Sequence, residues 1–78
     1  MPARRPNTQS DLKTQVAARV RALRHAQGWS QEVLAELSGL HRNYVGHVER
    51  AELTPGLINL AALARAFELS LSDFLDGV

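Results

Sequence analysis

Hydrophobic residues recur along this chain at helical spacing, not in the alternation that a half-buried strand requires. The first predicted helix starts near Asp11, and its apolar positions are separated by four, four and three residues. Those positions are Leu12, Val16, Val20 and Leu23. Gly28 follows the last of them and can end the helix in the left-handed backbone conformation that closes many helices.

Two short helices are predicted next, with a glycine between them. Ser30 is a candidate N-cap, and Glu32 in the first turn faces the positive end of the second helix. The apolar positions of this helix are Val33, Leu34 and Leu37, and it stops at Gly39. A third helix follows, with Leu40, Val45 and Val48 as its apolar residues.

The C-terminal part of the chain predicts two further helices. The segment "AELTPG" reads as a loop, and Pro55 can lie just before or at the first turn of the fourth helix. Apolar residues of this helix are Leu57, Leu60, Leu63, Ala64 and Phe67. Ser70 and Asp73 resemble a capping box in front of a short fifth helix with Leu71, Phe74 and Leu75. The fold class is therefore all-α, a compact five-helix bundle without a sheet.

Length and composition describe one small folded domain. The chain has 78 residues, 45% of them hydrophobic, and no cysteine. We expect a flexible N-terminal arm over residues 1–9 and one domain over residues 10–78. No stretch approaches the roughly 20 apolar residues of a membrane span, and no apolar segment follows the first arginines. These features suit a protein of the cytoplasm.

Charge is distributed unevenly along the chain. Residues 1–50 carry eight Lys or Arg against four acids, and residues 51–78 carry one Arg against four acids. A basic N-terminal part and an acidic C-terminal part suggest that the first meets a polyanion. In so short a chain, the same asymmetry can also arise as a fluctuation of small numbers.

The second and third predicted helices have the features of a helix-turn-helix. Ala35 lies four residues before Gly39. The small side chain of Ala35 allows the two helices to approach closely, and Gly39 allows the sharp turn between them. The predicted anchors are Leu34, Leu40, Val45 and Val48. They direct outward a face that consists of Arg42, Asn43, Gly46, His47 and Arg50. A helix fits the DNA major groove, where arginine and asparagine make bidentate contacts to bases. The alternative is an ordinary helical hairpin with a solvated polar face.

Residues 30–50 resemble the Cro and phage-repressor type of helix-turn-helix, the XRE family. The resemblance extends from about Val16 to Leu75 and includes "VRALRHAQGWSQEVLAELSGL", the "VER" ending and "LARAFELSLSDFL". It implies a lambda-repressor-like bundle that binds double-stranded DNA. Length and the stretch "GLHRNYVGHVER" are most similar to the small controller proteins of restriction–modification systems.

The resemblance also implies roles for individual residues. Gln31, with the Ser30 hydroxyl beside it, would bind a phosphate at the start of the second helix, and Gln31 would brace the third. Helix N-termini attract phosphates, which agrees with this role. Arg42, Asn43 and His47 match positions that contact bases. Tyr44 lies at the edge of this face and would either touch DNA or pack against the first helix.

Further expectations concern residues outside the base-contacting positions. Arg24 and Glu49 match a pair that joins the first and third helices in some relatives. Gly46 stands where the family commonly has serine, and it either lets the helix approach DNA closely or is a tolerated defect. The loop after the third helix departs from the family, because "AELTP" carries Glu52 in place of basic residues. Only Thr54 and backbone N–H groups can donate there, whereas Arg4 and Arg5 of the arm can reach the DNA backbone or remain free.

One reading helix covers few base pairs, so we expect a homodimer on a palindromic site with half-sites about 34 Å apart. The apolar excess after residue 55 suggests a dimer face formed by some of Ile58, Leu69, Leu71 and Phe74. The alternative is that all four belong to the core.

Catalysis is not expected. Neither a His-x-x-x-His pair nor a glycine-rich phosphate loop occurs, so the sequence suggests no metal, no cofactor and no small-molecule effector. We interpret the chain as a sequence-specific transcription regulator, and the resemblance to controller proteins suggests a restriction–modification operon as its target. The alternatives are an antitoxin-type protein that mainly binds a protein partner, and a monomeric helical scaffold. Sequence does not distinguish an activator from a repressor.

Overall fold

The computed structural model describes residues 8–78, which form five helices and contain no strand. The helices are α1 (Thr8–Ala26), α2 (Gln31–Ser38), α3 (Arg42–Glu49), α4 (Leu57–Ala66) and α5 (Leu71–Phe74). The all-helical prediction is confirmed. Helix α1 begins at Thr8, so residues 8 and 9 belong to it and not to the predicted arm. Arg4 and Arg5 lie outside the described residues.

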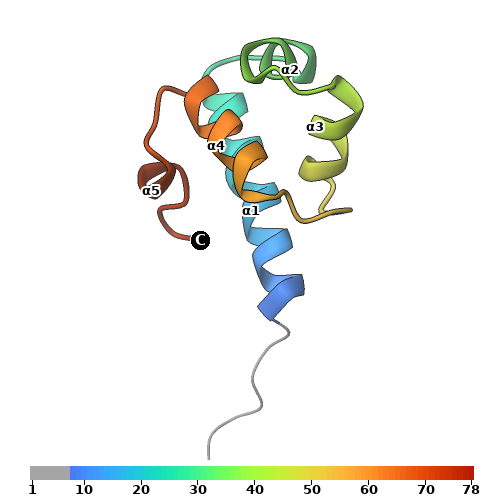
Figure 1. Ribbon diagram of the computed structural model, residues 1–78. Coiled ribbons are helices and arrows are strands. Elements are labelled where there is room, and N and C mark those ends of the chain that lie inside the picture. The colour runs from blue at the N-terminus through green and yellow to red at the C-terminus, as the bar shows by residue number, and fades with distance from the viewer. Residues whose placement is uncertain (1–7) are drawn as a thin grey trace, which may run out of the picture.

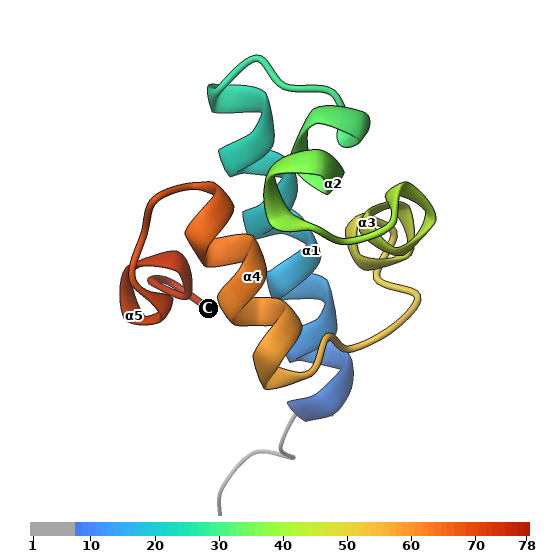
Figure 2. The ribbon, with the colours of Figure 1, turned by 45° about the horizontal axis from the view of Figure 1, so that its top comes forward.

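Helix α1 is the central element of the bundle (Figure 1). Helix α3 packs against α1 and α2, α2 also packs against α4, and α5 packs against α4. Figure 2 shows that α3 and α5 lie on opposite sides of α4. None of the helices within residues 8–78 is long and apolar enough to cross a membrane.

All five helices contribute to one hydrophobic core. Its fully buried residues include Val20, Leu34, Val45, Leu63 and Phe74, one from each helix. Burying a side chain of this size stabilises the fold by about 1.5–3 kcal/mol relative to leaving it exposed. Leu12 belongs to the predicted stripe but is exposed, because the N-terminal turns of α1 extend past the other helices (Figure 1).

Helices α1 to α4 end in the same way. The backbone N–H of Trp29, Leu40, Glu52 and Leu69 each donates to the carbonyl five residues earlier. The residue before each donor has a left-handed backbone, and the four residues are Gly28, Gly39, Ala51 and Glu68. These Schellman motifs confirm the two predicted glycine stops. Ala51 and Glu68 adopt the same conformation despite their β-carbons.

Phe74 corrects the predicted dimer face. Its ring stacks on Phe67 with centroids 6.2 Å apart, and Phe67 stacks on Trp29 at 5.3 Å. Phe74 is fully buried within its own chain, so its assignment to a dimer face is wrong. Arg19 of α1 holds α5 in place by donating to the carbonyls of Phe74 (2.8 Å) and Asp73 (2.9 Å).

Candidate nucleic-acid interface

Helix α3 is fixed by its apolar side. Val45 and Val48 are 0% and 1% exposed, and Leu34 of α2 is fully buried with them. Their burial confirms three of the four predicted anchors, and the fourth, Leu40, is partly buried and packs against the core. Ala35 is also buried, which fits its expected role as the small residue between the helices. Because the apolar side of α3 faces the core, its polar side is presented to solvent.

The polar side of α3 carries four exposed side chains, which we call the reading face: Arg42, Asn43, His47 and Arg50. They are all residues for which the sequence predicts DNA contact. His41 begins the helix as N-cap, because its Nδ1 accepts a hydrogen bond from the Asn43 N–H at 3.0 Å. This cap is not predicted from the sequence, since histidine is uncommon as an N-cap.

Tyr44 and Gly46 differ from the reading face. Tyr44 is partly buried and packs against the hydrophobic core, which favours the packing alternative for this residue. Gly46 is buried, and the Arg50 side chain lies over it: a β-carbon at Gly46 would lie 2.9 Å from Arg50 Nη1. Gly46 therefore gives the Arg50 guanidinium space to lie across the helix.

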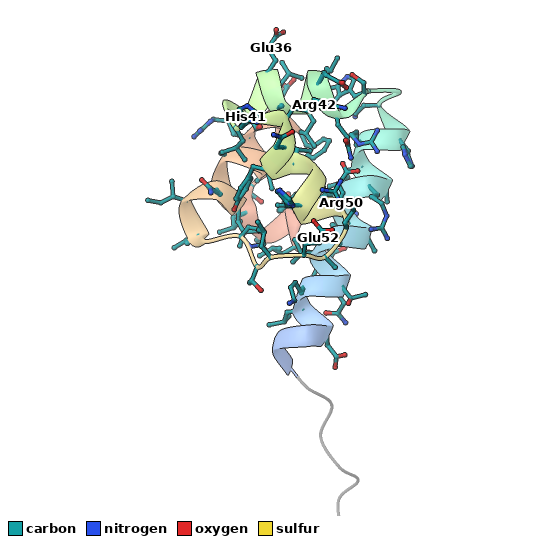
Figure 3. All side chains as sticks on the ribbon, turned by 90° about the vertical axis from the view of Figure 1, so that its right-hand side faces the viewer. Glu36, His41, Arg42, Arg50 and Glu52 are labelled. Atoms are coloured by element: carbon teal, nitrogen blue, oxygen red, sulfur yellow. The ribbon has the colours of Figure 1, made fainter. Side chains whose placement is uncertain are left out.

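Two carboxylates from outside α3 pair with the reading face. Arg42 Nε lies 2.7 Å from Glu32 Oε2 of α2. Glu52, in the loop after α3, pairs with both His47 (Nδ1–Oε1, 2.6 Å) and Arg50 (Nε–Oε2, 3.1 Å). The Arg50 guanidinium, and after it the His47 ring, lower the pKa of Glu52. Figure 3 shows Arg42 at one end of α3, with Arg50 and Glu52 at the other.

A buried polar cluster joins α3 to α1 and α2. Arg24 of α1 makes a bidentate ion pair with Glu49, at 2.6 Å from Nε and 2.9 Å from Nη2. Gln31 Nε2 donates to the same carboxylate at 3.1 Å. The side chains of Arg24 and Glu49 are only 12% and 3% exposed. Hydrogen bonding to Glu49 raises the pKa of Arg24 above its ordinary value.

This cluster agrees with the bracing role expected of Gln31. Its side chain points to Glu49, so Gln31 links the start of α2 to the end of α3. Arg21 adds a contact to the same helix end by donating to the Glu49 carbonyl. Ser30 caps α2 as predicted, accepting from the Val33 N–H at 3.1 Å. Thr54 is exposed in the loop after α3.

Comparison with known proteins places this geometry in a family. A helix-turn-helix family model, HTH_3, matches residues 20–74, which include the turn, the reading face and the buried cluster. The chain belongs to the XRE-type helix-turn-helix family. This is a family of DNA-binding transcription regulators and not of enzymes.

Individual members of the helix-turn-helix family show the same likeness. The control protein C.SmaI of Serratia marcescens is 46% identical over 65 residues, covering 83% of this chain and 77% of the relative. The controller protein C.AhdI of Aeromonas hydrophila is 44% identical, with a TM-score of 0.76 over 80% of this chain and 94% of the other. A hypothetical transcription factor from Neisseria, NHTF, has a TM-score of 0.78 at 37% identity, over 96% and 85% of the two chains.

No metal function emerges from the described part of the chain. Within residues 8–78, no group of three or more His, Asp or Glu side chains is placed to hold a metal ion. The chemistry that the site offers is hydrogen bonding and charge, from arginine, asparagine and histidine on one helix.

Proposed function

We propose that this protein is a homodimeric transcription regulator that binds a palindromic operator by inserting α3 into the major groove. The observation that carries the proposal is the exposed row of Arg42, Asn43 and His47 on a helix whose opposite side is fixed in the core. Arginine pairs with guanine and asparagine with adenine through two hydrogen bonds each. A reading helix must be held rigidly to use such contacts, and the Arg24–Glu49 pair holds it.

We further propose that the regulated genes are those of a restriction–modification system. C.SmaI is named as a control protein and C.AhdI as a restriction–modification controller protein, and both share more than two-fifths of their aligned residues with this chain. The aligned regions cover most of each relative. In this role Ser30, Gln31 and Thr54 would contact phosphates, since they flank the reading face at the start of α2 and in the loop.

Dimerisation uses the side of the molecule away from α3. Leu57 and Ile58 begin α4 and are 69% and 84% exposed. Leu69 and Leu71 are partly buried where α4 passes into α5. An apolar surface made of Ile58, Leu57, Leu69 and Leu71 leaves both reading faces of a two-fold dimer free for half-sites about 34 Å apart.

Selection from a random duplex library at near-physiological salt tests the function. We expect retained sequences to share a palindrome of two short half-sites. Retention of no motif, with binding that disappears as salt rises, would leave only phosphate attraction and would contradict the proposal. The protein partner of the antitoxin alternative would then be sought.

Arg42→Ala tests the reading face on the selected operator. We expect a loss of about 1–3 kcal/mol in binding and relaxed preference at one base position of each half-site. Matched titrations on operator and mixed-sequence DNA measure both. An equal loss on the two duplexes would show that Arg42 contacts only the backbone.

A further inference from the structure

Glu52 occupies a position where a DNA-binding surface would ordinarily carry a basic or an uncharged residue. It contacts two of the four side chains of the reading face, His47 at 2.6 Å and Arg50 at 3.1 Å. All three side chains are about half exposed, at 48%, 54% and 47% for His47, Arg50 and Glu52. The cluster therefore lies on the surface that DNA would approach, not in the interior (Figure 3).

Two locally unfavourable residues bring Glu52 and Arg50 together. Ala51 has a left-handed backbone with φ of 58°, which turns the chain so that the Glu52 N–H bonds the His47 carbonyl at 2.9 Å. Gly46, inside a helix, leaves room for the Arg50 guanidinium to lie toward Glu52. Glycine in a helix and a β-carbon at positive φ each weaken local structure. Here they accompany the helix-ending hydrogen bond at Glu52 and the pairing of Arg50 with Glu52.

A carboxylate at this position affects different DNA sequences unequally. Attraction between basic side chains and phosphates supplies nearly all of non-specific binding. Glu52 opposes that attraction twice, by neutralising the charge of Arg50 and by repelling phosphates itself. On an operator, hydrogen bonds to base edges compensate for separating these ion pairs. On other DNA, no such hydrogen bonds form, and the cost of separation remains.

We propose that Glu52 is a specificity-determining residue, an internal counter-ion of the reading face that weakens binding to non-operator DNA more than binding to the operator. The proposal rests on the proposed function, because it assigns a role within the same interface. It concerns the ratio of the two affinities and not the identity of the bases read. Each dimer would carry two such carboxylates, one at each reading helix.

The test compares Glu52→Gln with Glu68→Gln in the full chain. Both variants remove one negative charge and keep the length of the side chain. Glu68 is exposed and lies in the connection between α4 and α5. Helix α5, to which this connection leads, lies on the far side of α4 from α3 (Figure 2). Affinity for the selected operator and for a mixed-sequence duplex of equal length is measured at about 0.1 M salt.

We expect Glu52→Gln to bind the mixed-sequence duplex about three- to tenfold more tightly than the wild type, with operator affinity changed less than twofold. Glu68→Gln should change both affinities less than twofold. Equal effects of the two variants on mixed-sequence DNA would overturn the proposal. A loss of operator affinity in Glu52→Gln alone would also overturn it, because the carboxylate would then accept a hydrogen bond from a base.

Failure of the proposed function gives a different result. In that case the wild type prefers no sequence, and library selection reports this before any variant is made. The comparison of Glu52→Gln with Glu68→Gln on the mixed-sequence duplex needs no operator. It still decides whether Glu52 acts as a counter-ion to the basic side chains of α3.

Discussion

Glu49 is the residue through which three helices meet. Its carboxylate accepts hydrogen bonds from Arg24 of α1 and Gln31 of α2 while it belongs to the last turn of α3. At 3% exposure, its side chain has lost nearly all contact with water, so these partners replace the hydrogen bonds that water would otherwise make. An exposed ion pair contributes under ~1 kcal/mol, but a buried carboxylate left without its cation costs much more. The orientation of the reading face is therefore tied to one carboxylate.

Replacing Arg24 tests this dependence. We expect Arg24→Leu to lower the free energy of unfolding by about 3 kcal/mol, because Glu49 is left buried with Gln31 alone. The double variant Arg24→Leu/Glu49→Leu should recover a large part of that loss. Urea unfolding followed by the single tryptophan, Trp29, measures both. A double variant that is less stable than Arg24→Leu would show that the two side chains are not coupled in this way.

The pKa of the Glu52 carboxyl depends on two neighbouring side chains of the reading face. Its pKa is lowered first by Arg50 and then by His47. Ion pairing therefore favours the folded state at pH values above the ordinary carboxyl pKa, and this contribution is lost as pH falls through the lowered value. We expect Arg50→Ala to raise the pKa of Glu52 toward its ordinary value, as followed by NMR of the carboxyl carbon. An unchanged pKa in Arg50→Ala would contradict the pairing.

At the scale of elements, α3 is held firmly in place although its sequence has a low propensity to form a helix. It has eight residues, too few to be stable alone, and it contains Gly46. Tertiary contacts on its buried side compensate, as do the His41 cap and the Schellman motif at Ala51. The element is helical because of its surroundings more than its own propensity.

Gly46→Ala tests whether Gly46 weakens α3 while it gives space to the Arg50 side chain. Alanine is favoured over glycine within a helix by about 1 kcal/mol. The added β-carbon would meet only the mobile end of Arg50, so we expect a gain of about 0.5–1 kcal/mol in unfolding free energy. Urea unfolding measures the gain, and NMR of the Arg50 guanidinium follows its displacement. Destabilisation would show that the Arg50 position matters to the fold itself.

At the scale of the whole molecule, the protein carries two surfaces of different character. Helix α3 carries the polar reading face, and the start of α4 carries exposed Leu57 and Ile58. The acidic residues after position 51 include Asp73 and Asp76 near the C-terminal end. Negative charge on the side of α5 would disfavour phosphates there and leave DNA to the side of α3.

Ile58→Asp tests the proposed dimer face. Ile58 is 84% exposed, so the substitution should leave the fold intact while it places charge in the interface. We expect a folded monomer by light scattering and circular dichroism, with operator binding weakened by more than tenfold. Leu12→Asp, at an exposed apolar position of α1, is the matched control and should remain dimeric. Dimers of normal stability in Ile58→Asp would exclude this surface.

Much of this protein could be predicted from its sequence alone. The spacing of apolar residues predicted five helices, because a helix that packs on one side must repeat its buried positions every three or four residues. Gly28 and Gly39 marked helix ends, since glycine adopts a left-handed backbone without a steric penalty. The same logic identified Val45 and Val48 as anchors and therefore the outward side of α3.

The tertiary structure decided which apolar groups remain outside and, apart from the Arg24–Glu49 pair that the family resemblance implies, which polar groups meet. Phe74 and Ile58 are both apolar residues of the C-terminal part, yet one is fully buried and the other 84% exposed. Periodicity within a short helix cannot show which neighbour covers it. Likewise, the Arg24–Glu49–Gln31 cluster and the turn of Glu52 onto His47 and Arg50 depend on helix packing and on left-handed Ala51. Local sequence determines the elements because their hydrogen bonds are local, whereas charges and side-chain contacts between elements depend on the packed arrangement.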